Sequence, residues 1–258
     1  MLRKNLLALV GATLLAAPAS AQTLDEIVSK HVTARGGLAK LKAVNSIRLT
    51  GKMTMGPGLE APVTLELKRP KSMRMEFSFQ GMTAVQAFDG TTAWAIMPFG
   101  GKKDAEALPA DQAKELAEQA DFDGPLVDHA QKGHQVELLG KEKVEGSDAY
   151  KLKVTLKGGD IRYLYLDAEY FLEMKSEGRR IVRGSEMEVE SSMGDYKDVE
   201  GLMIAHAIEG GPKGTPMRQK LTVEKVEINP AMDDVRFKMP EPKPEAKPEP
   251  KASEKPKS

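Results

Sequence analysis

Short runs in which apolar and polar residues alternate recur along most of the chain. In "AYKLKVTLK", residues 149–157, apolar residues alternate with lysine and threonine. A period of two is that of a β-strand with one face buried and the other in water. Because antiparallel sheets tolerate one solvated face, the pattern predicts an antiparallel sheet with one apolar side.

About ten or eleven such strands are predicted, and no repeat of roughly 20–50 residues is visible. A sheet of this size is expected to curl toward its apolar side, which must then be covered. The predicted fold class is therefore mainly β, within the α+β class. It consists of one curved antiparallel sheet covered by α-helices.

Two helical segments are available as that cover. Thr23 and Glu26 form a capping-box pattern before an amphipathic stretch, and a short helical piece ending near Val44 follows it. The second segment, "LPADQAKELAEQA" at residues 108–120, has a thin apolar face that is rich in alanine. We expect this second helix to be held weakly.

Both ends of the chain are predicted to lie outside the folded domain. Residues 1–21 carry Arg3 and Lys4, an apolar run and Ala19-Ser20-Ala21, which is the pattern of a cleavable secretory signal. A membrane anchor is the alternative, but the apolar run is short for one. Residues 240–258 repeat proline with Glu and Lys, which indicates a disordered tail. The prediction is a periplasmic protein with one domain at residues 22–239.

The composition excludes several classes of protein. The chain has no cysteine, so neither a disulfide nor a cysteine-linked lipid is expected. Without Arg3 and Lys4, the 38 basic residues fall to 36 against 38 acidic ones, a net charge of about −2. This balance argues against a nucleic-acid partner. We expect a soluble monomer with no transmembrane segment in the mature chain.

No motif for catalysis or metal binding is present. The histidines form no metal-binding pair, and they are His31, His129, His134 and His206. A nucleophile elbow, a phosphate loop and a thiol are all missing from the sequence. We predict no catalytic residue, no metal and no cofactor, and therefore no enzyme. A hydrolase that uses an unrecognised pair of acids is the alternative.

One arginine breaks the alternation of the early strands. In "LELKRPKSMRMEF", residues 65–77, Arg69 stands where the pattern calls for another apolar residue, and Pro70 follows it. The apolar alternation then resumes at Met73. An ion pair at the end of a hairpin, with Glu66 or Glu76, is the simplest explanation for this arginine.

Three stretches of the sequence resemble the periplasmic lipoprotein carriers of the LolA-like family. "LELKRP" at residues 65–70 looks like that family's strand ending in Lys-Arg-Pro. "FDGTTAWAIMP" at residues 88–98 is similar to its Asp-Gly hairpin and tryptophan strand, and "VRFKMP" at residues 235–240 to its closing strand. "FDGPLVDHAQKGHQVELLGKEKVEG", residues 122–146, is closer to related lipoprotein-sorting-like proteins of the cell envelope.

The resemblance implies an unclosed β-barrel with a helical lid over an apolar cavity. Such a cavity accepts the acyl chains of a lipoprotein, or a similar lipid, between an inner-membrane donor and an outer-membrane acceptor. It also implies that Arg69 is a latch that hydrogen-bonds the lid. The residues expected to line the cavity are Leu49, Met53, Leu65, Leu67, Met73, Met75, Phe77 and Phe79.

Two explanations of the apolar face remain open at this point. Methionine, with 14 copies, is common at adaptable binding surfaces, but it also fills ordinary cores. The resemblance, and not the methionine content, predicts that the chain is a carrier of acyl chains. A structural or interaction module of the cell envelope, with the same fold and a self-filled cavity, is the alternative.

Overall fold

We analysed a computed structural model, which describes residues 22–56, 58–182 and 185–241. The predicted signal peptide lies outside the described residues, as does the predicted tail from residue 242 onward. Within the described part, 13 strands form one antiparallel sheet. They are β1 (Ser46–Thr54), β2 (Glu60–Lys68), β3 (Ser72–Phe79), β4 (Met82–Phe88), β5 (Ala93–Met97), β6 (Lys102–Ala107), β7 (Gln135–Val144), β8 (Ser147–Thr155), β9 (Ile161–Asp167), β10 (Glu173–Val182), β11 (Ser185–Val199), β12 (Leu202–Pro212) and β13 (Gln219–Ile228).

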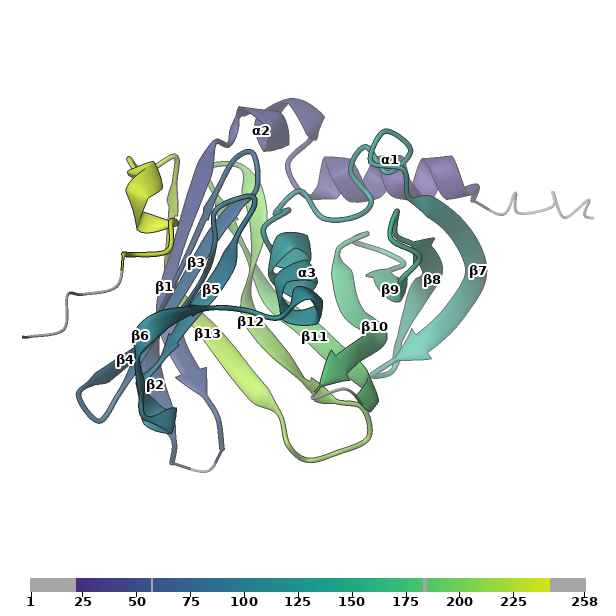
Figure 1. The fold of residues 1–258 in the computed structure, drawn as a ribbon. Coiled ribbons are helices and arrows are strands. Elements are labelled where there is room, and N and C mark those ends of the chain that lie inside the picture. The colour runs from purple at the N-terminus through teal and green to yellow at the C-terminus, as the bar shows by residue number, and fades with distance from the viewer. Residues whose placement is uncertain (1–21, 57, 183–184, 242–258) are drawn as a thin grey trace, which may run out of the picture.

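The sheet curves but does not close. Its strand order is β6-β5-β4-β3-β2-β1-β13-β12-β11-β10-β9-β8-β7, so the first and last strands pair in the middle. Figure 1 shows the two halves as walls that face one another, with β6 and β7 at the free edges. The predicted fold class, a mainly β unclosed barrel with helices, is confirmed.

Three helices lie against the curved sheet, and we call the side they cover the inner face. They are α1 (Leu24–Ala34), α2 (Leu38–Ala43) and α3 (Ala110–Gln119). The capping box predicted for α1 is present, because the Thr23 side chain accepts from the Glu26 amide and the Glu26 carboxylate accepts from the Thr23 amide. Figure 1 shows α1 and α2 along one end of the barrel and α3 between its two walls.

Each helix covers its own part of the inner face. Ile27 of α1 is fully buried among leucines and valines of β8 and β9. Leu41 of α2 packs with apolar residues of β1, β12 and β13. Leu116 of α3, with Ala120 just after it, packs on β2, β3, β4 and β5. The core beneath the helices is therefore spread along the inner face in three clusters, and two smaller clusters lie elsewhere on the sheet.

The C-terminal part of the chain covers the opposite, outer face. The closing strand expected from the resemblance at residues 235–240 is not formed, and a 3-10 turn, η2 (Asp234–Arg236), occupies the start of this stretch. Phe237 is buried, and its carbonyl accepts a 2.8 Å hydrogen bond from the Trp94 indole. The backbone of this stretch thus bonds to a side chain of β5, which is distant in sequence, and does not pair with another strand.

Candidate functional site

Cross-strand register places apolar side chains in a continuous row on the inner face. The row crosses β1, β13, β12 and β11, and it consists of Met53, Leu221, Ile208 and Met193. All four side chains are only half-buried. This part of the inner face is therefore apolar and still partly accessible.

The residues predicted to line a cavity all belong to the inner face, but they differ in burial. Leu49, Leu67 and Met73 are buried against α2 or α3. Leu65 and Met75 are half-buried, and both pack on the cluster beneath α3. The helices thus cover one end of the predicted lining.

Three phenylalanines lie together farther along the inner face. The Phe77 and Phe99 rings are stacked with centroids 5.7 Å apart, and Phe79 meets Phe99 edge to face at 6.3 Å. Phe99 is among the exposed large apolar residues. Together with Met53, Phe77 and Phe79 give this end an accessible apolar surface.

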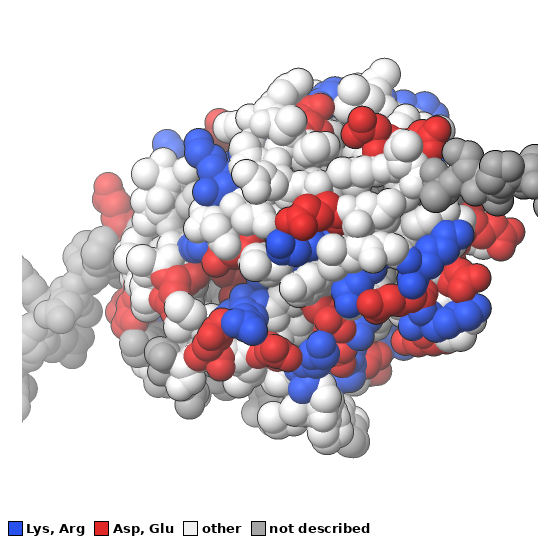
Figure 2. Space-filling model, turned by 90° about the vertical axis from the view of Figure 1, so that its right-hand side faces the viewer, with Lys and Arg blue, Asp and Glu red and all other residues white. Residues whose placement is uncertain are grey.

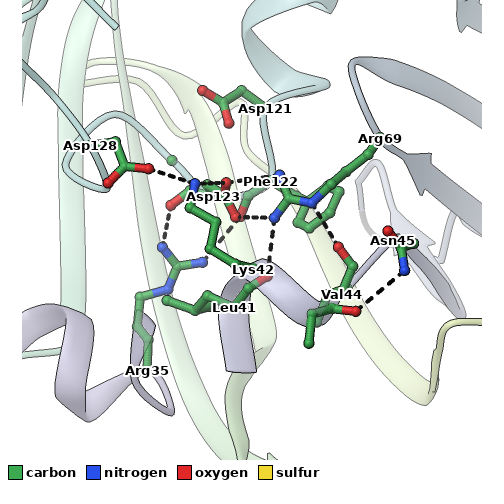
Figure 3. A network of polar contacts seen from close by, with 12 residues as sticks. Arg35, Leu41, Lys42, Val44, Asn45, Arg69, Asp121, Phe122, Asp123 and Asp128 are labelled. Atoms are coloured by element: carbon green, nitrogen blue, oxygen red, sulfur yellow. Dashed lines mark hydrogen bonds and ion pairs between the residues drawn. The ribbon is translucent and has the colours of Figure 1, made fainter. Parts of the chain in front are cut away.

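Arg69 connects the end of β2 with α2 and with the segment that follows α3 (Figure 3). Its Nε donates to the Val44 carbonyl at 2.7 Å and its Nη2 to the Leu41 carbonyl at 3.0 Å. Both Nη atoms also bond the two carboxylate oxygens of Asp123, at 2.9 and 2.7 Å. The guanidinium lies 4.6 Å from the centroid of the Phe122 ring.

Asp123 is the ion-pair partner of Arg69, and neither glutamate considered from the sequence takes that place. Glu66 is buried on the outer face between Arg48 and Arg236, and Glu76 bonds Arg74. Asp123 lies 54 positions from Arg69, in a stretch for which the sequence predicted no contact with that arginine. The available signal was a single acid between Phe122 and Gly124, which is too common to identify a partner.

Two further cations hold the same segment (Figure 3). Lys42 pairs with Asp123 at 3.0 Å and with Asp128 at 2.6 Å, and Arg35 donates to the backbone carbonyls of Phe122 and Asp123. Burial alone would raise the pKa of the Asp123 carboxyl, but hydrogen bonds from Arg69 and Lys42 hold that pKa below its usual value. The carboxylate thus stays charged although its side chain is only 2% exposed.

A half-buried acid, Glu173, lies on the inner face at the start of β10. Glu173 pairs in register with Leu166, which packs under α1. Burial raises the pKa of the Glu173 carboxyl to about 7, although the positive charge of Arg35 and a hydrogen bond from Ser176 oppose the rise. No sequence pattern predicted a role for Glu173, because it lies in an ordinary polar alternation.

Two crevices lie apart from the predicted lining. The first, about 420 Å³, is formed by β9, β10, β11 and Lys213, and the second, about 330 Å³, lies between α3 and β9 to β11. Their walls are mostly charged, and none of the eight predicted residues lines either crevice.

Neither metal ligands nor a membrane-spanning helix were found in the part of the chain that the structure describes. No group of three or more His, Cys, Asp or Glu side chains is arranged to hold a metal ion there. Among the described helices, none is long and apolar enough to cross a membrane.

Three solved structures with a similar fold illustrate the likeness. A putative outer membrane lipoprotein-sorting protein domain from Vibrio parahaemolyticus matches with a TM-score of 0.55 at 12% identity, covering 82% of this chain and 94% of that one. A LolA superfamily protein from Nitrosomonas europaea matches with a TM-score of 0.55 at 16% identity, covering 84% and 98%. A DUF1329 family protein from Desulfovibrio piger matches with a TM-score of 0.52 at 11% identity, covering 84% of this chain and 98% of that one.

Comparison of the sequence alone gives no relatives. No family model matches the chain, and no curated protein is similar to it. At these identities the structural likeness establishes the fold. The resemblance predicted from the sequence is thereby confirmed as a resemblance of fold.

Proposed function

We propose that this chain, which has the fold of the LolA superfamily, is a periplasmic carrier of acyl chains. Its ligand would be the lipid part of a lipoprotein, or a similar amphiphile, held on the inner face and moved toward the outer membrane. The donor and the acceptor would be proteins of the inner and outer membranes. No catalytic step is required for this function.

The half-buried apolar row of Met53, Leu221, Ile208 and Met193 is the observation that carries the proposal. Burying an acyl chain gains about 0.8 kcal/mol per CH₂. A wall four strands wide that is apolar but incompletely covered is suited to that purpose. The covering helices supply a lid, and the Arg69 network joins this lid to the sheet.

A fluorescent fatty acid provides the test. Met53→Glu places a charge in the accessible row, and Met75→Glu places one beside α3, so both are expected to weaken saturable binding at least about tenfold. Thr222→Glu is the matched control, because Thr222 is exposed and adjoins Leu221 on the opposite face of β13. Mass spectrometry of protein purified from its native envelope is expected to detect acylated material.

Equal binding by all three variants would contradict the proposal, as would clean native protein that takes up no probe. The alternative, an envelope interaction module with a self-filled interior, has one observation in its favour. Leu67 and Met73 are buried by the protein's own α3, and both crevices are lined mostly by charged residues. That alternative predicts partners whose capture depends on residues 239–258 and is unaffected by Met53→Glu.

A further inference from the structure

The two long sides of α3 are held by different kinds of contact. On one side Leu116 and Ala120 pack against buried Leu67, Met73 and Phe88. On the other side, three ion pairs join the helix to the wall formed by β9 and β10. They are Lys114 with Asp160, Glu115 with Arg180 at 2.6 Å, and Glu118 with Arg162 at 2.8 Å.

These ion pairs stand over the crevice of about 330 Å³ between α3 and the β9–β10 wall. All six paired side chains line it, so the crevice is bounded by charges of both signs. Figure 1 shows α3 in front of the inner face and between the walls. Figure 2, which views the molecule from the side of β7, shows acidic and basic side chains crowded together on the lower part of that face.

The cations of the two arginine pairs belong to the wall, whereas the anions belong to the helix. Arg162 on β9 makes a second bond, from Nη1 to the Arg179 carbonyl at 3.0 Å. It also lies over Gly178, where an added Cβ would meet that Nη1 at 2.5 Å. A movement of α3 would thus carry Glu115 and Glu118 away and leave the guanidiniums on the sheet.

We propose that this crevice is the entrance to the inner face and that it binds an anionic head group, carboxylate or phosphate, on Arg162 and Arg180. The head would replace Glu118 and Glu115 while its chain lies on the apolar row. Guanidinium groups bind both anions with paired, charge-assisted hydrogen bonds. Both ion pairs are partly exposed, and ion pairs that water reaches are weak enough to be exchanged in this way. The proposal rests on the carrier function and names the chemical class of its ligand.

The first test compares amphiphiles that share one alkyl chain and carry a carboxylate, a phosphate or a neutral alcohol as head. The wild type is expected to bind both anions about tenfold more tightly than the alcohol. Arg162→Gln with Arg180→Gln should abolish this preference. Glu115→Gln with Glu118→Gln should strengthen it, because the guanidiniums then lack a competitor. Lys153→Gln with Glu137→Gln, a pair between β7 and β8, is the matched control.

Opposite effects of the two double variants cannot arise from a general loss of folding, which circular dichroism monitors separately. Inorganic phosphate separates the two sources of an anion. If phosphate alone stabilises the wild type and competes with the alcohol as well as with the anions, the site is one for free phosphate and the proposal is overturned. If phosphate competes with the two anionic amphiphiles but not with the alcohol, the result supports a head-group site.

The second test needs no ligand and uses the absence of cysteine from the chain. Ser176 is half-buried on β10 and pairs in register with Leu164 of the inner face. The Ser176→Cys protein is labelled with a maleimide. Adding Glu115→Gln and Glu118→Gln to it should speed the labelling about tenfold, because two of the three ion pairs are lost. Added salt should speed labelling in the parent and much less in the variant.

If neither added salt nor the two glutamate substitutions changes the labelling rate, the proposal that this crevice is the entrance is contradicted. Equal affinities for all three head groups would overturn the anion site and leave the carrier function standing. Absence of binding by every amphiphile would contradict the carrier function itself, and the head-group proposal with it.

Discussion

At the scale of single residues, Arg69 joins the end of β2 to two segments that are distant in sequence, residues 41–44 and 122–123. Arg69→Leu restores the alternation of apolar residues but removes the forked partner of the buried Asp123, which then keeps its ion pair with Lys42. Removing one partner of a buried ion pair costs about 3 kcal/mol. We expect a loss of this size in chemical unfolding, and a smaller loss in Arg69→Lys, which keeps the charge without the forked donors.

The same variants test the latch. If Arg69 holds the lid, Arg69→Leu still takes up a fluorescent fatty acid but no longer transfers it to acceptor vesicles normally. Unchanged transfer together with the expected loss of stability would show a purely structural role. The sequence pointed to Arg69 because it breaks an alternation, whereas Asp123 could not be predicted, since only the folded chain brings the two together.

His31 and Glu173 are expected to give opposite dependences of stability on pH. Burial lowers the pKa of His31 to about 4, so the unfolded chain alone takes up its proton between pH 6.5 and 4, and stability falls as the pH falls. Burial raises the pKa of Glu173 to about 7, so its contribution is complete below pH 4.5 and is lost as the pH rises through 7.

Between pH 5 and 6.5 the two contributions, about 1.5 kcal/mol each, nearly cancel. Unfolding free energies measured at these two pH values should therefore differ little in the wild type. His31→Gln should make stability fall as pH rises, and Glu173→Gln should make it rise. Parallel pH profiles for all three proteins would show that these groups titrate alike in the folded and unfolded states.

At the scale of elements, residues 230–239 form a strap across the outer face of the first half of the sheet. Phe237 is only 1% exposed, its carbonyl accepts from Trp94, and Arg236 bonds the buried Glu66. Phe237→Ala should cost about 3 kcal/mol and expose the tryptophan to water.

Because the chain has one tryptophan, its fluorescence reports on this strap alone. A red shift of the emission is expected in Phe237→Ala. Val235→Ala, in the same turn but 68% exposed, should leave both emission and stability unchanged. An unshifted spectrum in Phe237→Ala would mean that the strap does not depend on that ring.

Elements whose signals are local were predictable, whereas elements that depend on distant partners were not. The capping box at Thr23 and the strand at residues 149–157 carry their own patterns. Edge strand β6 has the polar sequence "KKDAEA" and forms because β5 offers it a partner. The sequence of the strap resembles that of a strand, but its Phe237 carbonyl accepts a hydrogen bond from the Trp94 indole and does not pair with a neighbouring strand.

At the scale of the whole molecule, the pairing of β1 with β13 joins the two halves into one sheet. The alternation in each strand predicted a large curved sheet, but no local pattern specifies that the first and last strands meet. The register of this pair shifts between Thr50 and Gly51, where β13 has an irregularity. The two strands pair along eight positions, and their backbones come into close contact at this irregularity.

Gly51 makes that contact possible, and replacing it provides a test of the whole architecture. A Cβ at Gly51 would lie 2.0 Å from the Thr222 carbonyl oxygen, a backbone atom that cannot turn aside as a side chain can. Gly51→Ala should therefore cost about 3 kcal/mol and lower the melting temperature by roughly 10 °C. Gly194→Ala is the matched control in β11, because its Cβ would meet nothing within 4 Å.

The control should be neutral or slightly stabilising, since alanine reduces the freedom of the unfolded chain. Because β1 and β13 join the halves, Gly51→Ala should also speed hydrogen exchange in strands on both sides of the junction, far from the substitution. Exchange that quickens only in β1 and β13 would contradict this view. The two halves would then hold their structure independently, and the barrel would be two meanders placed side by side.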